Sequence, residues 1–498
     1  MLQNGSNGIT AHSSHEAMEH PWQSSLLLPV AVALAFIVVW ATLRRCWAKR
    51  SPKRNRVPPG RLGFPIIGET LEFLRMKREN RLKDFYGVRE ERYGEVFRTS
   101  LYGDETISLP PPFGNKFLFT SENSLVLNRW PSHTVALLGK HSISVLTGDD
   151  HKYTKGVLMA FLCPDALQRY VDKVCEVAEK HIANFWEGRS QVVVHPLTRR
   201  FTLSVACSLF VSLDDKNEQT KLIVPFAALS AGLFQLPIDL PWTMYGKAKL
   251  GRFAIHKELD KYIAERKKQL KDGTASPDQD LLSSLLTTPD GNGNLLIDDA
   301  VKDNILFLLF AGHETTASTL SLALMFLLRN PDSLQQMLKE QLEIKREKKD
   351  GEGLNWEDLK KMKYSWRVLQ ETLRMYPPAQ GGFRKAKVDF EFAGYSIPRG
   401  CKLVWTTWRS HKQERFFPNP EKFDPSRFEG APQPYTYVPF GGGPRLCPGM
   451  EFAKMEMLIL FHYLVTRFVW SMVDPLEKVI SDPMPCPEKG LSIDICPR

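Results

Sequence analysis

The stretch DDAVKDNILFLLFAGHETTASTLSLALMFLLR, Asp298 to Arg329, constrains the fold of this 498-residue chain more than any other. Asp298 or Asp299 is a suitable N-cap, and Asn330-Pro331 ends the run. A helix of this length measures about 45 Å, enough to cross a whole domain. Because it is apolar on nearly every face, it must be buried in a large core or cross a membrane. A glutamate and two threonines at its midpoint make a membrane span costly, so we expect a buried central helix.

The polar break in this helix consists of Gly312, His313, Glu314, Thr315 and Thr316. Glycine permits close approach of another group, and Thr315 can hydrogen-bond to a carbonyl one turn earlier or open the helix for a ligand or water. One interpretation is a kink or a satisfied internal polar cluster. The other is a site for proton delivery, in which Glu314 is a relay and Thr315 holds a water or an oxygen species. The stretch by itself favours neither interpretation.

A second constraint is the loop FGGGPRLCPG, Phe440 to Gly449, which precedes the apolar-periodic segment MEFAKMEMLILFHYLV. Cys447 lies just before a helix N-terminus, where N–H groups and the helix dipole stabilise a thiolate, and Arg445 adds positive charge. A nucleophilic cysteine needs a histidine base, and none is placed to serve. A metal-ligating thiolate fits the residues better. Because one cysteine is available, the other ligands must come from elsewhere, as in a macrocycle.

The composition excludes other classes of protein. The chain has eight cysteines without a CxxC pair, so zinc and thioredoxin chemistry have no support, and we expect reduced thiols in a cytosol-facing domain. The formal net charge of +10 permits nucleic acid, an anionic membrane or an acidic protein as partner. No RNA-binding or zinc-finger pattern is present, so we expect no nucleic-acid partner.

The N-terminal part predicts a membrane anchor. Residues 26–43, LLLPVAVALAFIVVWATL, carry no charge and span about 27 Å as a helix. No Lys or Arg precedes this run, and seven basic residues follow it between Arg44 and Arg56. This order of charges favours a retained signal anchor over a cleaved signal peptide, which needs a positive leading region.

The anchor divides the chain into regions. The positive-inside rule places the short N-terminus, residues 1–25, in the lumen and the rest of the chain in the cytosol. Asn4 would then be a potential glycosylation acceptor. A basic, proline-rich hinge, residues 44–68, follows the anchor and leads to one large domain, residues 69–498.

A carboxylate and two arginines form a further candidate cluster. Glu371 and Arg374 in QETLRMYPP lie on one face of a helix that Pro377-Pro378 ends. Such pairs are usually solvated surface, but apolar residues surround this turn. A half-buried arginine needs more than one partner. The segment PEKFDPSRF supplies a further arginine, Arg427.

Together these stretches resemble the cytochromes P-450, the haem-thiolate monooxygenases. AGHETT, residues 311–316, resembles the family's oxygen-activating motif, and the carboxylate–arginine cluster resembles its structural triad. The likeness extends from about Val57 to the C-terminus and implies a mainly α fold with small β-sheets, preceded by one N-terminal transmembrane helix. The family's haem-binding signature is matched by Phe440-x-x-Gly443-x-Arg445-x-Cys447-x-Gly449.

The resemblance implies roles for these residues. Cys447 would be the axial ligand of the iron of haem b, and Glu314 and Thr315 would deliver protons for dioxygen activation. Glu371, Arg374 and Arg427 would hold the fold beneath the haem. The other haem-contacting positions would be Arg445, which pairs with a propionate, Phe440, Gly443, Gly449, His151 and Lys155.

His151 and Lys155, in HKYTK, depart from the family's usual pattern. Many relatives have an aromatic residue or His at the first position and Arg at the second. Lys155 can still meet a propionate, but as a point charge instead of a bidentate fork. We therefore expect haem binding to survive this departure.

Four stretches resemble plant members that oxidise terpenoids and sterols, the group of brassinosteroid, triterpenoid and taxoid hydroxylases: PPGRLGFPIIGET, LPIDLP with WTMYGKA, YSWRVLQETLRMYPP and GYSIPRGCKLVWTT. Pro241-Trp242-Thr243 departs from the Pro-Gly-Thr of many relatives, in the region that covers the access channel. Apolar pocket residues suit a lipophilic polycyclic substrate, although plain core packing explains any one of them equally well. The pocket candidates are Phe307, Phe310, Ala311, Gly381 and Phe383.

The sequence therefore predicts a single-pass protein of the endoplasmic reticulum membrane, with a haem-thiolate catalytic domain facing the cytosol. It would oxidise a terpenoid or sterol with dioxygen and with NADPH electrons from NADPH–cytochrome P-450 reductase, which would dock on the basic surface around the cysteine loop. The alternative is a haem-thiolate isomerase or dehydratase that acts on peroxides without a reductase. The pair Glu314-Thr315 argues against it, because that chemistry need not protonate dioxygen. A non-catalytic haem-binding protein is the least supported hypothesis.

Overall fold

The computed structural model describes residues 32, 35, 38–39, 56–64, 67–349 and 351–498. Residues 56–498 form one compact unit, and residues 1–55 form a second. In the predicted anchor, Val32, Ala35, Val38 and Val39 are helical and exposed. The rest of residues 26–43, the predicted lumenal N-terminus 1–25 with Asn4, and residues 44–55 and 65–66 of the predicted hinge lie outside the described residues.

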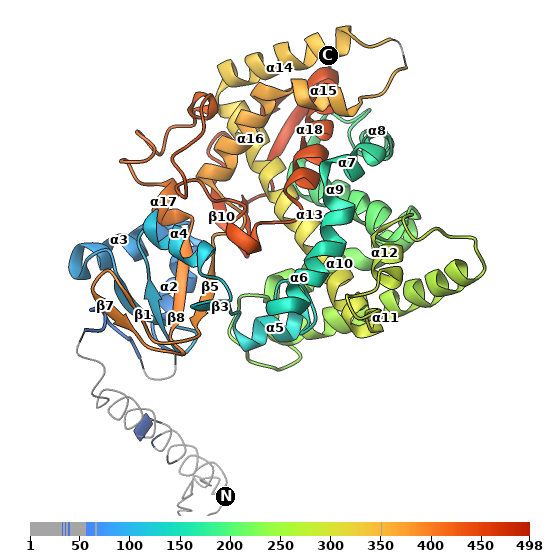
Figure 1. The fold of residues 1–498 in the computed structure, drawn as a ribbon. Helices are drawn as coiled ribbons and strands as arrows, with labels where there is room; N and C mark the ends of the chain where they lie inside the picture. Colours follow the sequence, from blue (N-terminus) through green and yellow to red (C-terminus); the bar gives the residue numbers. More distant parts are fainter. Residues whose placement is uncertain (1–31, 33–34, 36–37, 40–55, 65–66, 350) are drawn as a thin grey trace, which may run out of the picture. The chain divides into compact units, whose positions relative to one another are not determined.

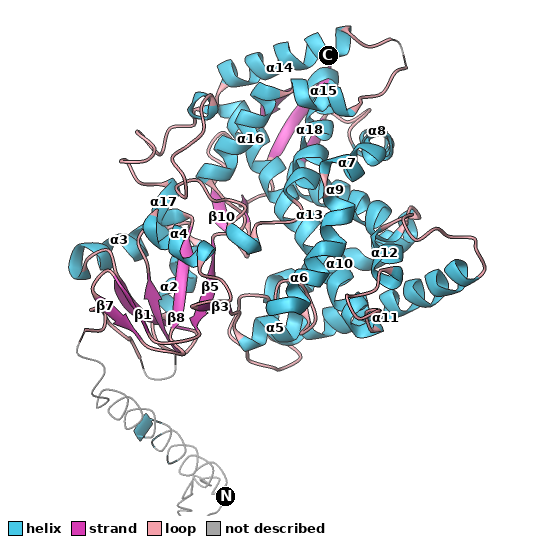
Figure 2. Cartoon of the chain, in the orientation of Figure 1, coloured by secondary structure: helices cyan, strands magenta, loops and turns pink. Residues whose placement is uncertain are grey.

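Helices make up most of the larger unit, as predicted (Figure 2). The α-helices are α2 (Thr70–Arg78), α3 (Leu82–Tyr93), α4 (Phe113–Thr120), α5 (Ser132–Leu138), α6 (Gly148–Leu162), α7 (Pro164–Leu167), α8 (Val171–Phe185), α9 (Val194–Val211), α10 (Lys216–Gly232), α11 (Met244–Lys271), α12 (Leu281–Thr287), α13 (Asp298–Arg329), α14 (Pro331–Arg346), α15 (Trp356–Lys361), α16 (Lys363–Met375), α17 (Trp408–His411) and α18 (Met450–Arg467). Short 3₁₀ turns are η2 (Gln168–Tyr170), η3 (Pro425–Phe428) and η4 (Gly443–Arg445).

The strands are short and gather mainly beside α2, α3 and α4 (Figure 1). They are β1 (Phe97–Leu101), β2 (Asp104–Ser108), β3 (Val126–Asn128), β4 (Gln191–Val193), β5 (Gly381–Ala386), β6 (Phe390–Phe392), β7 (Tyr395–Ile397), β8 (Lys402–Thr406), β9 (Phe468–Met472), β10 (Val479–Ser481), β11 (Pro485–Pro487) and β12 (Ser492–Pro497).

The long apolar stretch forms α13 over the predicted range and runs through the middle of the helical part of the unit (Figure 1). It packs against α9, α11, α14, α16 and α18, and most of its side chains are buried. Within the described residues, α13 is the helix whose length and composition match a membrane span, and 78% of its most apolar window is buried in the protein. The prediction of a buried core helix is therefore confirmed.

The predicted N-cap of α13 is wrong by one residue. Ile297 occupies the N-cap position, and Asp298 and Asp299 lie in the first turn. In the first turn, their carboxylates still interact favourably with the positive end of the helix dipole. They also pair with Lys267 and Lys302, at 2.5 and 3.0 Å respectively.

The five-stranded sheet has the order β1-β2-β8-β5-β3. β2 and β8 are parallel, and the other neighbouring strands are antiparallel. The pairing of β3 with β5 sets Asn128 opposite Arg384, and the pairing of β5 with β8 sets Gly381 opposite Thr406. The sheet thus brings β3 and β5, which are far apart in the sequence, side by side next to the cavity described below. Smaller sheets are β4-β12-β9, β10-β11 and β6-β7.

Candidate functional site

A largely apolar cavity of about 310 Å³ lies between α13, α18, α6 and the start of β5. Its wall includes Cys447 on one side and Thr315 of α13. Ten of the seventeen residues predicted for the site contribute to this wall, so the structure brings together segments from across the chain. The ten are His151, Lys155, Phe307, Ala311, Thr315, Gly381, Phe440, Arg445, Cys447 and Gly449.

Seven predicted residues lie off this wall. Glu314 lines a different cavity, and Gly443 lies in η4, within the cysteine loop but off the cavity wall. Phe310 is buried in the core, and Phe383 packs edge-on against Tyr102 with ring centroids 6.3 Å apart. The predicted triad residues Glu371, Arg374 and Arg427 form a separate cluster.

The cysteine loop is held in an irregular shape by backbone contacts. The Cys447 N–H donates to the Phe440 carbonyl at 3.0 Å, and α18 begins three residues later at Met450. Gly443 has a φ of +63°, and a Cβ there would lie 2.1 Å from the Phe119 carbonyl oxygen. Any side chain at this position would push the loop away from α4, so only glycine fits.

Burial raises the pKa of the Cys447 thiol, although the Gly449 N–H and the Lys155 ammonium act in the opposite direction. The expectation that the helix start keeps this thiol ionised is therefore wrong for the protein alone, because desolvation outweighs the helix dipole. A metal ion deprotonates a coordinating thiol outright. A cation in the cavity would thus favour the thiolate form of Cys447.

The two central residues of the polar break face different cavities. The Thr315 hydroxyl donates to the Ala311 carbonyl at 2.6 Å and lies on the wall of the cysteine cavity. The Glu314 side chain lines a second cavity of about 200 Å³ with His195, Arg199 and other residues. Successive residues on a helix point about 100° apart, so adjacent side chains can reach different cavities.

Glu314 is held as a carboxylate. It pairs with Arg199, and its Oε1 lies 3.1 Å from His313 Nε2. Burial alone raises its pKa, but the contacts with His313 and Arg199 outweigh burial and lower the pKa to about 2. Glu314 is therefore ionised across the physiological range and accepts hydrogen bonds in this form.

Cationic side chains gather on one part of the cavity wall, around a carboxylate that sequence reasoning missed. Glu122 Oε1 accepts from Arg445 Nε at 3.1 Å, and Glu122 Oε2 lies 2.9 Å from Arg384 Nε. Lys155 donates to the Pro444 carbonyl at 2.6 Å. Burial, together with the charges of Arg445, Lys155 and Arg384, lowers the pKa of His151 to about 4, so its imidazole is neutral.

Neither Arg384 nor Glu122 belongs to a recognisable motif. Their positions depend on the pairing of β3 with β5, which places Asn128 opposite Arg384. Local sequence carries no signal for such a long-range contact. Phe210 and Phe452 also line the cavity from α9 and α18 and were not among the predicted pocket residues.

This donor set fits a haem. The cavity presents one thiol, apolar and aromatic walls, and two arginines whose planar groups match carboxylates. Arg445 Nη2 is buried and has no hydrogen-bond partner among the described residues. A macrocycle that carries an iron and two propionates would satisfy the thiol and this unpaired donor together.

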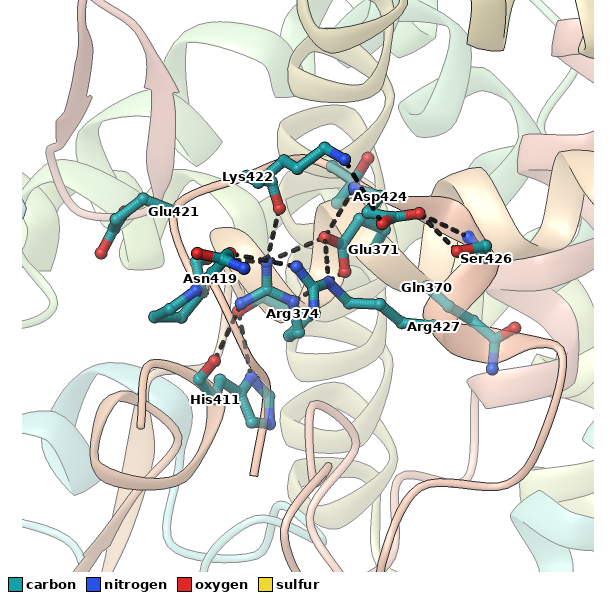
Figure 3. Close-up of polar contacts among 12 residues, drawn as sticks. Gln370, Glu371, Arg374, His411, Asn419, Glu421, Lys422, Asp424, Ser426 and Arg427 are labelled. Atoms are coloured by element: carbon teal, nitrogen blue, oxygen red, sulfur yellow. Dashed lines mark hydrogen bonds and ion pairs between the residues drawn. The ribbon is translucent and has the colours of Figure 1, made fainter. Parts of the chain in front are cut away.

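The predicted structural triad is assembled in the structure (Figure 3). Arg374 donates to both oxygens of Glu371, from Nε at 2.7 Å and from Nη2 at 2.8 Å, and both side chains are fully buried. Arg427 Nε donates to Glu371 Oε1 at 3.3 Å. The remaining Arg374 donors reach the carbonyls of His411, Pro420 and Lys422.

Known proteins share this arrangement over nearly the whole chain. The family model for Cytochrome P450 matches residues 58–493. The chain is 44% identical to a beta-amyrin 28-monooxygenase of Medicago truncatula, over 89% of this chain and 93% of that protein. It is 43% identical to a beta-amyrin 28-monooxygenase of Solanum lycopersicum, over 95% of this chain and 99% of that protein. The solved structure of retinoic acid bound cyanobacterial CYP120A1 is similar at a TM-score of 0.81 and 34% identity, over 89% of this chain and 100% of that chain.

The fold and the thiol-bearing cavity define a haem-thiolate protein. The chain belongs to the cytochrome P450 family. It is a monooxygenase that uses haem b, dioxygen and electrons from NADPH that a reductase delivers.

Glu371→Gln is expected to lower the free energy of unfolding by about 3–5 kcal/mol, because it leaves Arg374 buried without its charged partner. Glu357→Gln is the matched control. It removes the carboxylate of another i,i+3 pair, with Lys360 at 2.7 Å, but that pair is exposed on α15. The control should cost less than about 1 kcal/mol. Denaturant unfolding of both variants measures the loss in free energy of unfolding that each change causes. Equal losses would show that the buried pair stabilises the protein no more than the exposed pair does.

Proposed function

We propose that this monooxygenase is membrane-anchored and oxidises a lipophilic triterpenoid. The observation that carries the substrate proposal is the identity of 43–44%, over 89–95% of the chain, to two beta-amyrin 28-monooxygenases. Beta-amyrin is a polycyclic, almost wholly apolar molecule. A substrate of this kind suits a cavity with apolar and aromatic walls, because burial of its surface drives binding.

In this proposal Cys447 holds the haem iron from the side of the cavity where α18 begins. Arg445 and Arg384, with Lys155 and the neutral His151, hold the propionates. Haem with a thiolate ligand supplies the chemistry that splits dioxygen and inserts one oxygen atom into a substrate C–H bond. Glu122 fixes the two arginines, because each of its carboxylate oxygens engages one guanidinium Nε.

Residues of α13 would orient the substrate and position protons in the cavity. Ala311 and Phe307 lie on the cavity wall about one and two turns before Thr315. Trp130 and Phe210 add aromatic surface from other segments. Thr315 presents its hydroxyl to the same space and would order water there. The apolar walls exclude bulk water, which otherwise competes for the reactive oxygen.

The membrane association in this proposal rests on two features. Residues 26–43 have the length and charge flanks of a signal anchor, which would place residues 69–498 on the cytosolic face of the endoplasmic reticulum. The loop between α10 and α11 and the start of α11 expose the apolar side chains of Ile238, Trp242 and Met244, at 53%, 71% and 51%. A group of exposed apolar side chains of this size marks a surface that contacts lipid or protein.

The reductase partner in this proposal is NADPH–cytochrome P450 reductase. Lys116 on α4 and Lys152 on α6 are exposed, α4 packs against η4 of the cysteine loop, and Lys155 on α6 contacts the loop carbonyls of Pro444 and Leu446. Such a basic surface attracts an acidic partner. The alternative of a peroxide-rearranging isomerase is not favoured, because the two relatives are monooxygenases.

The direct test uses microsomes that contain this chain and a plant reductase. With beta-amyrin and NADPH we expect products heavier by one or more oxygen atoms in mass spectrometry, and none without NADPH. A panel of sterols and smaller terpenoids tests the substrate class. Oxidation of sterols alone would overturn the triterpenoid proposal, and turnover of a lipid hydroperoxide without NADPH would favour the isomerase.

Thr315→Ala is expected to lower the fraction of NADPH electrons recovered in product by at least about tenfold, because the cavity loses the hydroxyl that orders water for proton transfer. Haem content should be unchanged, and the lost electrons should be found as hydrogen peroxide. Thr315→Ser is the matched control, since it keeps the hydroxyl. If Thr315→Ala recovers as many NADPH electrons in product as the wild type, the hydroxyl of Thr315 has no role in proton transfer.

A further inference from the structure

A small cavity with positively charged side chains has no role in the scheme above. It measures about 80 Å³ and lies between α8, α9 and the start of α10, and we call it the α8–α10 cavity. Among the described residues, none lines both this cavity and the cysteine cavity. The α8–α10 cavity has room for several water molecules, or for a small ionic group with a few apolar atoms attached.

The two acidic side chains of this wall are already paired with lysines of the same wall. Asp214 lies 2.9 Å from the ammonium of Lys173. Glu176 pairs with Lys180 and lies 3.4 Å from Lys173. These four residues therefore balance one another, and their charges cancel to a first approximation.

Arg200 on α9 and Lys216, the first residue of α10, are the remaining cations of the wall. The side chain of neither forms an ion pair or a hydrogen bond within the part of the chain that the structure describes. The guanidinium carbon of Arg200 lies 4.9 Å from the centre of the Phe185 ring, which also lines the cavity. The wall thus carries two unpaired positive charges, which favour an anion.

His181 on α8 contributes an unsatisfied nitrogen to the same wall. The residue is only 5% exposed, and its Nε2 is buried without a hydrogen-bond partner within the described residues. Burial, together with the charges of Arg200 and Lys216, lowers the pKa of His181 to about 3, so the imidazole is neutral and carries one N–H. Buried polar atoms without partners are rare in native proteins. A ligand oxygen in the cavity would satisfy this nitrogen.

The other neutral polar side chain that is buried in this wall, Gln219, is already satisfied. Its amide accepts from the Ser204 hydroxyl at 2.8 Å and donates to the Leu213 carbonyl at 2.6 Å. The wall between the polar groups is apolar and includes Val177, Leu203 and Ile223. An apolar wall with a few convergent polar groups is typical of a small-molecule site.

We propose that the α8–α10 cavity binds a phosphate monoester of a small apolar molecule. A phosphate monoester carries nearly two negative charges at neutral pH and three acceptor oxygens. Arg200 and Lys216 match the charge, and they and the N–H of His181 supply a donor for each oxygen. The apolar part of the ligand would contact the apolar side chains of the wall. Such a ligand occupies neither the haem site nor the substrate space, so the inference goes beyond the proposed function.

Titration calorimetry of the full-length holoenzyme in a phosphate-free buffer tests this site, with phenyl phosphate as the probe. We expect saturable binding of one molecule per chain and an unchanged haem absorption spectrum. Inorganic phosphate lacks the apolar part, and benzoate carries a single charge. Each should bind at least about fivefold more weakly than phenyl phosphate.

Charge-removing variants test the two cations. Arg200→Gln and Lys216→Gln should each weaken the binding of phenyl phosphate by about tenfold, because each removes a charged hydrogen-bond donor. Lys221→Gln is the matched control. It removes another exposed lysine of α10, one that pairs with Glu218 at 2.5 Å and lies off the cavity wall. The control should stay within about twofold of the wild type.

Two substitutions of His181 test the role of its nitrogen. His181→Phe keeps a ring of similar size without the N–H and should weaken binding by about tenfold. His181→Gln places an amide N–H near the position of Nε2 and should stay within about threefold of the wild type. If His181→Phe fails to fold, the comparison of His181→Gln with the two charge-removing variants still tests the site.

The outcomes separate this inference from the proposed function. A wild-type holoenzyme that shows no saturable binding of phenyl phosphate would overturn the inference, and so would binding that survives the combined Arg200→Gln and Lys216→Gln changes. An equal loss in Lys221→Gln would show attraction by net charge alone and overturn it as well. Equal or tighter binding of benzoate or inorganic phosphate would overturn the assignment of a phosphate monoester. Binding as expected in a chain that does not oxidise beta-amyrin would support the site and contradict only the proposed substrate.

Discussion

The buried pair of Glu371 and Arg374 is the interaction on which the geometry of the cysteine cavity depends. The guanidinium of Arg374 also donates to backbone carbonyls. Its bond to the His411 carbonyl begins a chain of contacts that leads to the cysteine loop. His411 Nε2 accepts from the Val438 N–H at 2.9 Å, and burial next to Arg374 lowers the pKa of His411 to about 3, so its ring stays neutral and can accept. Val438 stands two residues before the loop that holds Cys447.

This arrangement explains why an ion pair is retained in the core, where a hydrophobic pair is often equally stable. An apolar pair cannot bind carbonyl groups. Arg374 fixes three loop carbonyls that no regular strand or helix would satisfy, and Arg427 fixes a fourth, that of Asn419. A loop of irregular backbone can therefore be rigid, and its thiol can keep one position in the cavity wall.

Charged side chains are unevenly distributed over the wall of the cavity. On one part of its wall Arg384 and Arg445 pair with the carboxylate of Glu122, and Lys155 adds a further positive charge. Along α13 and α18 the wall is apolar apart from hydroxyl groups. One region suits the carboxylates of a cofactor, and the other suits an apolar substrate.

Features that depend on local sequence were predictable. The long apolar run and the proline boundary located α13, the glycines and Cys447 located the loop before α18, and the spacing of Glu371 and Arg374 placed both on one face of α16. Long-range pairing was not predictable, which is why Arg384 and Glu122 were missed. The division of Glu314 and Thr315 between two cavities was also not predictable, because adjacent residues on a helix can share a cavity, as Thr315 and Thr316 do.

The central claim is that the Cys447 thiolate faces the cavity as the ligand of the haem iron. The carbon monoxide difference spectrum of the reduced enzyme tests it most directly, because its long-wavelength band is specific for a thiolate ligand. We expect Cys447→Ala to lose this band and Cys175→Ala, which removes another buried thiol on α8, to keep it. An unchanged band in Cys447→Ala would contradict the account.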